Sequence, residues 1–183
     1  MTPYNFTIHI TTERDINDIR EVETNAFRFS KEADLVADLL GDETAHPMLS
    51  LLARHQGKAI GHILFTRATL NGEIDTPLMH ILAPLAVIPE YQGMGVGGLL
   101  IRHSIKHLKA MECQMVFVLG HATYYPRHGF EPYAEGKGYP APYPIPEQYQ
   151  SCWMLQSLSA QPLGRTGRIQ CAQTLMKPEH WRE

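Results

Sequence analysis

Residues 82–98, LAPLAVIPEYQGMGVGG, form the stretch that decides the fold of this chain. An apolar run ends at Pro89, and the segment after Gly98, LLIRHSIKHLKAM, has the three- and four-residue apolar spacing of a helix. We therefore expect the glycines at a turn from a strand into a helix. Glycine lets the backbone approach a ligand closely, and the first turn of a helix presents unpaired N–H groups beside the positive end of the helix dipole. The pattern predicts a nest of amides for a polyanion such as a pyrophosphate.

Two families use such a turn, and the spacing distinguishes them. Residues 93–98 satisfy the G-x-G-x-x-G pattern of dinucleotide-binding folds. That fold would place an Asp or Glu about 20 residues further on, where this sequence has Gly120-His121. The same stretch also contains Gln92-x-x-Gly95-x-Gly97, and in this form it resembles the acyl-CoA-binding motif of the GCN5-related N-acetyltransferases (GNAT).

A second motif lies downstream of the first. Residues 124–130, YYPRHGF, resemble the Y-x-x-x-G-F element that follows the next strand in GNAT enzymes. The longer stretches LAPLAVIPEYQGMGVGGLL and VLGHATYYPRHGF are similar to the YhbS-like predicted N-acetyltransferases of bacteria. The resemblance runs from Phe6 to about Leu158. It implies an α/β GNAT fold, in which helices flank a mixed, strongly twisted central sheet, here followed by a late loop rich in Pro and Tyr.

The resemblance also implies how acetyl-CoA, the acyl donor, is held. The backbone amides of residues 93–98 would bind the pyrophosphate, and residues 85–87 would pair with the pantetheine arm. An amide of Leu85 or Val87 would face the thioester oxygen, where one donor typically stabilises the tetrahedral oxyanion by ~3–4 kcal/mol. The predicted cofactor-binding residues are Leu85, Ala86, Val87, Gln92, Gly93, Met94, Gly95, Val96, Gly97 and Gly98.

Tyr125 is the predicted catalytic residue. It stands four residues before Gly129, the position whose phenol faces the CoA sulfur in many GNAT enzymes and protonates the departing thiolate. The alternative is a tyrosine that only packs in the core. A phenol near pKa 10 that gives its proton to a thiol near pKa 8.5 does so uphill by about 2 kcal/mol. Tyr125 would therefore need a lowered pKa, with Arg127 as a candidate cause, or would act as a hydrogen-bond donor. Tyr124 is the second candidate for this role.

An amine must lose a proton before it attacks a thioester, so a general base is expected. The sequence offers four candidates without choosing among them: Glu21, Glu23, His80 and His121. Four aromatic residues either border the acceptor pocket or only pack: Phe27, Phe29, Tyr139 and Tyr143.

Composition argues against several other classes of protein. The chain has 16 basic and 19 acidic residues, so it lacks the basic footprint of a protein that binds nucleic acid or an acidic membrane surface. Its three cysteines include no C-x-x-C pair, which argues against a disulfide framework or a zinc site. His103 and His107 share a helix face, but the flanking Arg102 and Lys106 favour a solvated basic face, and we predict no metal site.

The N-terminal stretch, MTPYNFTIHITTERD, lacks the pattern of a signal peptide. No run approaches the roughly 18 apolar residues of a membrane span. We therefore expect a cytoplasmic protein.

The rest of the chain fits the same fold. A length of 183 residues predicts one domain, and the resemblance implies that its core covers about residues 6–158. Thr12 and Ser30 are expected to cap two helices. Prolines interleaved with tyrosines predict a long ordered loop over 131–149. The strands are expected at 6–10, 48–55, 59–70, 76–88, 115–119 and 152–158, with an edge strand within 167–174.

We therefore expect an N-acetyltransferase that moves an acetyl group from acetyl-CoA to an amine of a small molecule or protein by direct attack on the thioester. The alternative is a CoA-binding protein of the same fold, with weak or no catalysis, that acts as a regulator through a protein partner. The sequence does not identify the acceptor amine, and a homodimer is compatible with it.

Overall fold

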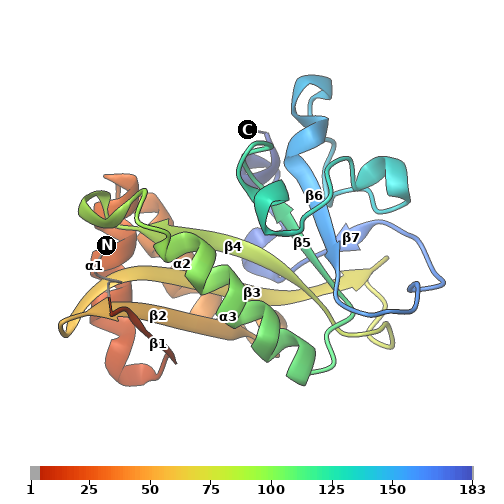
Figure 1. The fold of residues 1–183 in the computed structure, drawn as a ribbon. Helices are drawn as coiled ribbons and strands as arrows, with labels where there is room; N and C mark the ends of the chain where they lie inside the picture. The colour runs from red at the N-terminus through yellow and green to blue at the C-terminus, as the bar shows by residue number, and fades with distance from the viewer. Residues whose placement is uncertain (1–4, 183) are drawn as a thin grey trace.

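The computed structural model describes residues 5–182, in which seven strands form one sheet. The order is β1-β2-β3-β4-β5-β6, with β7 paired to β3. Only β4 and β5 run parallel, so the sheet is mixed, as predicted (Figure 1). The strands are Thr7–Ile10 (β1), Leu49–His55 (β2), Lys58–Leu70 (β3), Met79–Val87 (β4), Met115–Leu119 (β5), Trp153–Ser157 (β6) and Ile169–Gln170 (β7).

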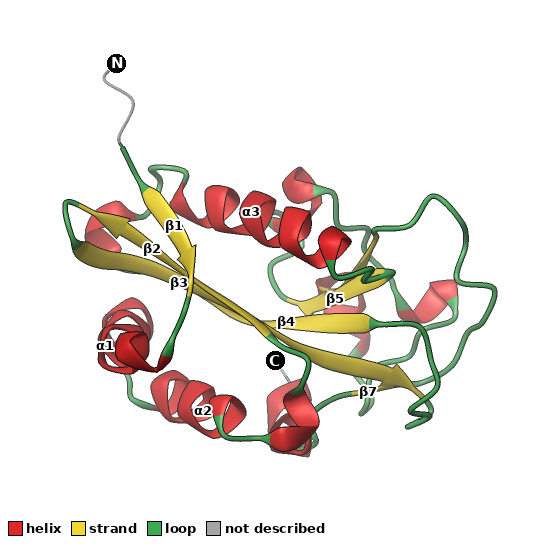
Figure 2. Cartoon of the chain, turned by 90° about the horizontal axis from the view of Figure 1, so that it is seen from below, coloured by secondary structure: helices red, strands yellow, loops and turns green. Residues whose placement is uncertain are grey.

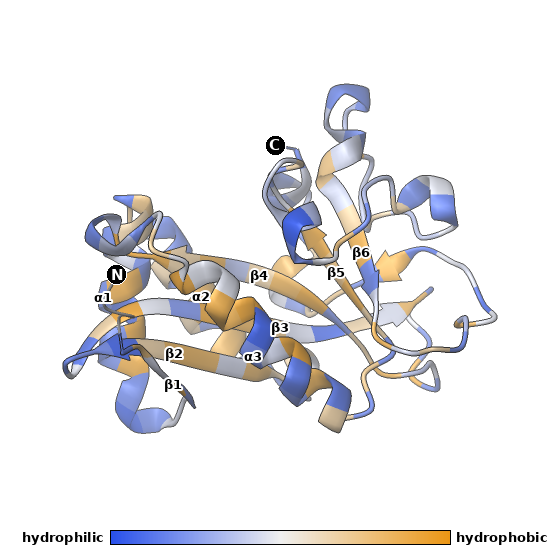
Figure 3. Cartoon of the chain, viewed as in Figure 1, coloured by the Kyte–Doolittle hydropathy of each residue, from blue (hydrophilic) through white to orange (hydrophobic). Residues whose placement is uncertain are grey.

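Helices cover both faces of this sheet. Helices α1 (Ile16–Phe27) and α2 (Lys31–Leu40) lie on one face, and α3 (Val96–Ala110) lies on the other (Figure 2). The residues of β2 are mostly hydrophobic, as a strand between two layers requires (Figure 3). Gly61 on β3 lets α3 approach the sheet closely, because a Cβ there would lie 3.0 Å from Val96 and 3.1 Å from Leu100.

The two predicted helix caps differ. Thr12 forms a capping box with Asp15, and the 3-10 turn that it caps, Glu13–Asp15, leads directly into α1. Ser30 occupies the N-cap position of α2, but its side chain makes no capping bond because its backbone is already helical (φ −80°, ψ −12°). The capping role predicted for Ser30 is therefore wrong, although the helix begins where expected.

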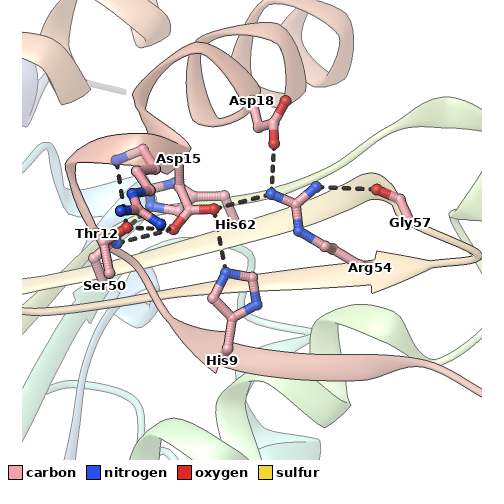
Figure 4. A network of polar contacts seen from close by, with 9 residues as sticks. His9, Thr12, Asp15, Asp18, Ser50, Arg54, Gly57 and His62 are labelled. Carbon is pink, nitrogen blue, oxygen red and sulfur yellow. Dashed lines mark hydrogen bonds and ion pairs between the residues drawn. The ribbon is translucent and has the colours of Figure 1, made fainter.

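Asp15 ties α1 to the sheet. Its carboxylate accepts hydrogen bonds from the Thr12 amide at 2.9 Å and from Arg54 of β2 at 2.9 Å, and it lies 3.3 Å from His9 of β1 (Figure 4). Arg54 also contacts Asp18 at 2.5 Å. The Thr12 amide, followed by Arg54 and His9, lowers the pKa of Asp15 to about 2 against the opposing effect of burial.

Residues 131–152 pack against the sheet as an irregular segment with short 3-10 turns at Glu135–Lys137 and Glu147–Cys152. The Tyr139 hydroxyl donates to the Arg165 carbonyl at 2.9 Å, and the Trp153 indole donates to the Tyr139 carbonyl at 2.8 Å. The Tyr143 hydroxyl donates to the Met176 carbonyl at 3.1 Å. These bonds hold the segment onto the core.

The central strand begins later than predicted, at Met79 instead of residue 76, and Pro77 has no N–H for a strand ladder. None of the helices within residues 5–182 is long and apolar enough to cross a membrane. The first four residues of the N-terminal stretch that lacks a signal-peptide pattern lie outside the described residues.

Candidate acyl-CoA cleft

The site begins where β4 and β5 separate. Their parallel pairing runs from Met79 opposite Met115 to Leu82 opposite Val118. Beyond Leu82, the remaining residues of β4 pair only with β3. One backbone edge of residues 85–87 is therefore not occupied by a neighbouring strand.

The register of β3 and β4 indicates which backbone groups face that edge. The Ile88 amide donates to the Ile60 carbonyl at 3.0 Å, and hydrogen-bonded pairs alternate along an antiparallel ladder. The alternation assigns Ala86 to bond across to β3, whereas Leu85 and Val87 direct their N–H and C=O groups to the free edge. The Gln92 side chain, which donates to the Val87 carbonyl at 2.9 Å, agrees with this orientation.

The glycine turn follows directly after β4. Gly93 (φ +77°) and Gly95 (φ +84°) adopt the left-handed conformation that only glycine adopts readily, and Gly95 is the N-cap of α3. The first amides of α3 have no carbonyl partner within the helix, so they are available to a ligand. The positive end of the helix dipole adds to their attraction for an anion.

One cleft of about 630 Å³ joins the turn, the free edge of β4 and the second motif. Among the predicted cofactor-binding residues, Ala86 and Met94 do not line it: Ala86 is buried, and Met94 is 39% exposed. The lining residues are Leu85, Val87, Tyr91, Gln92, Gly93, Gly95, Val96, Gly97, Gly98, Arg102, His121, Tyr124, Tyr125, Arg127 and His128.

Two of the glycines, Gly97 and Gly98, lie in close contact with side chains of the second motif. A Cβ at Gly97 would collide with the hydroxyl of Tyr124, and a Cβ at Gly98 would lie 2.7 Å from the His128 ring. Neither glycine has a positive φ, so a side chain there would cause no backbone strain but would force Tyr124 or His128 to shift. The second motif therefore folds directly over the first turn of α3.

Tyr125 begins the short 3-10 turn Tyr125–His128, and only 8% of its surface is exposed, toward the cleft. Its ring packs edge-on against Phe130 at 5.5 Å and Tyr124 at 5.2 Å, and a Cβ at Gly120 would collide with it. Burial, followed by the neighbouring Tyr124, raises the pKa of Tyr125 above its usual value.

Arg127 does not act on Tyr125 as the sequence suggested. Its guanidinium lies over the ring of Tyr124, 5.7 Å from the centroid. Burial raises the pKa of Tyr124, while Arg127 and Arg102 oppose the rise. The idea that Arg127 lowers the pKa of Tyr125 is therefore wrong.

Arg102 and His128 also line the cleft, and neither was predicted. Arg102 stands four residues after Gly98 on α3, so helical spacing from the glycine turn could have identified it. Burial lowers the pKa of His128, and the adjacent Arg102 and Arg127 lower it further.

Comparisons with known proteins show the family of this chain. The model of the acetyltransferase (GNAT) family matches residues 16–130. The chain belongs to the GNAT family. The uncharacterized N-acetyltransferase YjhQ of Escherichia coli (strain K12) is 74% identical over 172 residues, which is 94% of this chain and 95% of that protein. The fold, the family and the enzyme class predicted from the sequence, an N-acetyltransferase, are confirmed.

Two solved GNAT structures cover nearly the whole chain. YhbS from Escherichia coli, in complex with CoA, has a TM-score of 0.84 at 27% identity and covers 94% of this chain and 92% of its own. A GNAT acetyltransferase from Brucella melitensis, in complex with acetyl-CoA, has a TM-score of 0.74 at 25% identity. It covers 94% of this chain and 99% of its own.

In this GNAT protein, the four candidate bases lie in different places. Only His121 lines the cleft. Glu21 is exposed on α1. Glu23 is fully buried and 2.5 Å from His62. His80 is fully buried beside Cys113 and the Pro47 carbonyl, and burial lowers its pKa to about 4.

The four aromatic residues considered for an acceptor pocket do not line the cleft. Tyr139 and Tyr143 anchor the late segment through their hydroxyls. Phe27 packs against the core, and Phe29 is 72% exposed.

Proposed function

We propose that this protein transfers an acetyl group from acetyl-CoA to an amine. The observation that carries the proposal is the single cleft lined by the free edge of β4, the glycine turn and Tyr125. The CoA and acetyl-CoA in the two similar structures support the same donor.

In this proposal the backbone binds most of the donor. The amides of residues 93–98 hold the pyrophosphate, and the free edge at Leu85 and Val87 pairs with the amide groups of the pantetheine arm. Arg102 and Arg127 line the same cleft as the turn and would neutralise phosphate charge. Gln92 holds the Val87 carbonyl and thereby fixes the end of β4 relative to the turn.

The chemistry is a direct displacement. The neutral amine attacks the thioester carbonyl carbon, the oxyanion is stabilised by an amide at the β4 edge, and the C–S bond breaks to release CoA thiolate. The amine proton passes to His121, directly or through water, and the thiolate accepts a hydrogen bond from the Tyr125 hydroxyl. Because the pKa of Tyr125 is raised, we assign it as a hydrogen-bond donor and not as a full proton donor.

The proposal is tested by release of CoA thiol from acetyl-CoA in the presence of candidate acceptors. The panel should include simple amines, polyamines, aminoglycosides and peptides with free α- or ε-amino groups. Release that depends on one acceptor class, with the acetylated product identified by mass, is the expected result. Tight acetyl-CoA binding without release against any acceptor would instead indicate a regulator that acts through a protein partner.

A further inference from the structure

Another cavity, of about 380 Å³, is lined by residues of α1, α2 and the neighbouring strands β1 and β2 and by the segments that join them. It shares no lining residue with the acyl-CoA cleft. Most of the surface that lines it is aliphatic. Two of the lining residues, Ile10 and Ile16, are 52% and 50% exposed, which is unusual for isoleucine. The lining residues are Ile10, Thr11, Thr12, Glu13, Ile16, Ile19, Leu40, His46, Met48 and Ser50.

Ser50 is the first member of a polar chain that leads from this cavity into the core. Its Oγ lies 2.9 Å from Nε2 of His62 on the neighbouring strand, and both residues are labelled in Figure 4. The other ring nitrogen of His62, Nδ1, lies 2.5 Å from Oε1 of Glu23 on α1. The hydroxyl, the imidazole and the carboxylate therefore form a chain in which each group is within hydrogen-bond distance of the next.

The exposure of the three residues falls from the cavity inward. Ser50 is 6% exposed and lines the cavity, whereas His62 and Glu23 are both fully buried. Glu23 Oε2 has no hydrogen-bond partner among the described residues, and an unsatisfied buried carboxylate oxygen is costly. If Glu23 and His62 only filled space in the core, apolar side chains of similar volume at these positions would stabilise the protein as well or better.

The arrangement determines what the imidazole can do. Burial raises the pKa of Glu23, and the contact with His62 opposes the rise. In its ionised form Glu23 accepts a hydrogen bond from Nδ1–H, which leaves Nε2 with a lone pair directed at the Ser50 hydroxyl. This is the order of contacts by which a carboxylate orients a histidine and the histidine activates a serine in serine hydrolases on unrelated folds. We propose that Ser50 is a nucleophile activated by His62 and Glu23, and that it reacts with short-chain carboxylic esters bound in this aliphatic cavity.

The reaction balances with water as the only co-reactant. Ser50 Oγ forms a bond to the ester carbonyl carbon, its proton passes to His62 Nε2, and the C–O bond to the alcohol breaks as His62 returns that proton to the leaving oxygen. Water then attacks the acyl-serine, with His62 as base, and releases the carboxylic acid and the free Ser50 hydroxyl. The sum is ester plus water to acid plus alcohol.

The position of Ser50 also limits the expected rate. Ser50 lies within β2, where the neighbouring backbone amides belong to the sheet ladder, and not at a strand-to-helix turn with amides free to hold an oxyanion. One such donor is typically worth about 10²–10³-fold. We therefore expect both the acylation of Ser50 and the overall turnover to be slow.

The test uses the full chain without acetyl-CoA, so its outcome is independent of the proposed acetyl transfer. The protein is incubated with diisopropyl fluorophosphate, the modified peptide is mapped by mass spectrometry, and hydrolysis of p-nitrophenyl butyrate is followed in parallel. The variants are Ser50→Ala, Glu23→Gln and a matched control, Ser104→Ala. Ser104 is likewise buried, but on α3 at the other face of the sheet.

We expect the label on Ser50 in the wild type and in Ser104→Ala, and none in Ser50→Ala. Glu23→Gln should slow labelling by about 10²-fold while the melting transition stays cooperative, because the neutral amide no longer orients His62 as a base. Absence of label on Ser50 in the folded wild type would overturn the proposal. Equal ester hydrolysis by the wild type and a folded Ser50→Ala variant would overturn it as well.

Discussion

Removal of one oxygen atom, in Tyr125→Phe, separates a role in turnover from a role in packing. The ring keeps its contacts with Phe130, Tyr124 and Gly120, and only the hydroxyl of this cleft-lining residue is lost. We therefore expect the free energy of unfolding to change by less than about 1 kcal/mol.

The loss in turnover follows from the environment of the phenol. The pKa of Tyr125 is raised above its usual value, so complete proton transfer to a thiolate is uphill by more than about 2 kcal/mol. A hydrogen bond to the developing thiolate remains available, and hydrogen bonds to charged groups contribute about 1.5–3 kcal/mol. At 1.36 kcal/mol per tenfold, kcat should fall about 10- to 150-fold.

The assay is steady-state release of CoA thiol at saturating acceptor, beside calorimetric titration of acetyl-CoA. Because the thiolate exists only as the thioester breaks, acetyl-CoA affinity should stay within about twofold. Tyr124→Phe is the matched control, and its kcat should fall much less. An unchanged kcat in Tyr125→Phe with chemistry rate-limiting, or a loss explained by a lower melting temperature, would refute the assigned role.

Three further substitutions test contacts of Gly120, Asp15 and Arg102. Gly120→Ala should displace the Tyr125 ring, because the added Cβ has no room beside it, and should lower kcat at least as much as loss of the hydroxyl. Asp15→Asn should destabilise the protein at pH 7 by up to about 2 kcal/mol through the weakened contacts with the Thr12 amide, Arg54 and His9. The pKa of Asp15 is about 2 in the folded protein, below the usual 3.8, so the stabilisation by its carboxylate is present above pH 4 and is lost as the pH falls toward 2. The melting temperature of the variant should therefore fall less steeply with acid pH than that of the wild type. Arg102→Ala should raise the dissociation constant of acetyl-CoA by about 3- to 10-fold at low salt, with a smaller effect at high salt because the charge is exposed; an effect independent of salt would argue against a phosphate contact.

The parts of the fold predictable from the sequence were those encoded locally. The glycine turn could be placed because the apolar run before Pro89 and the helical spacing after Gly98 both lie beside it. The hairpin of β2 and β3 was marked by the turn at Gln56-Gly57. The inactive cap at Ser30 shows the limit of such local signals, because its residue type fits a cap whereas its backbone is already helical.

The unpredicted parts of the site depend on contacts between distant segments. Arg127 was assigned to Tyr125 from proximity in sequence, but the turn at Tyr125–His128 directs its guanidinium over Tyr124. Glu23 was a candidate base by residue type, and only the fold shows that it is buried against His62, whose other ring nitrogen faces Ser50 at a different cavity. The spacing of residues along the sequence does not indicate which side chains from distant segments contact one another in the fold.

The most direct test of the acyl-CoA cleft is calorimetric titration of the full chain with acetyl-CoA and, separately, with NADH. We expect one micromolar acetyl-CoA site per chain, no heat with NADH, and loss of binding in Gly97→Glu, where the side chain would displace the Tyr124 hydroxyl and place a negative charge at the first turn of α3. Binding of NADH in preference to acetyl-CoA, or unchanged acetyl-CoA affinity in a folded Gly97→Glu variant, would contradict the assignment of this cleft.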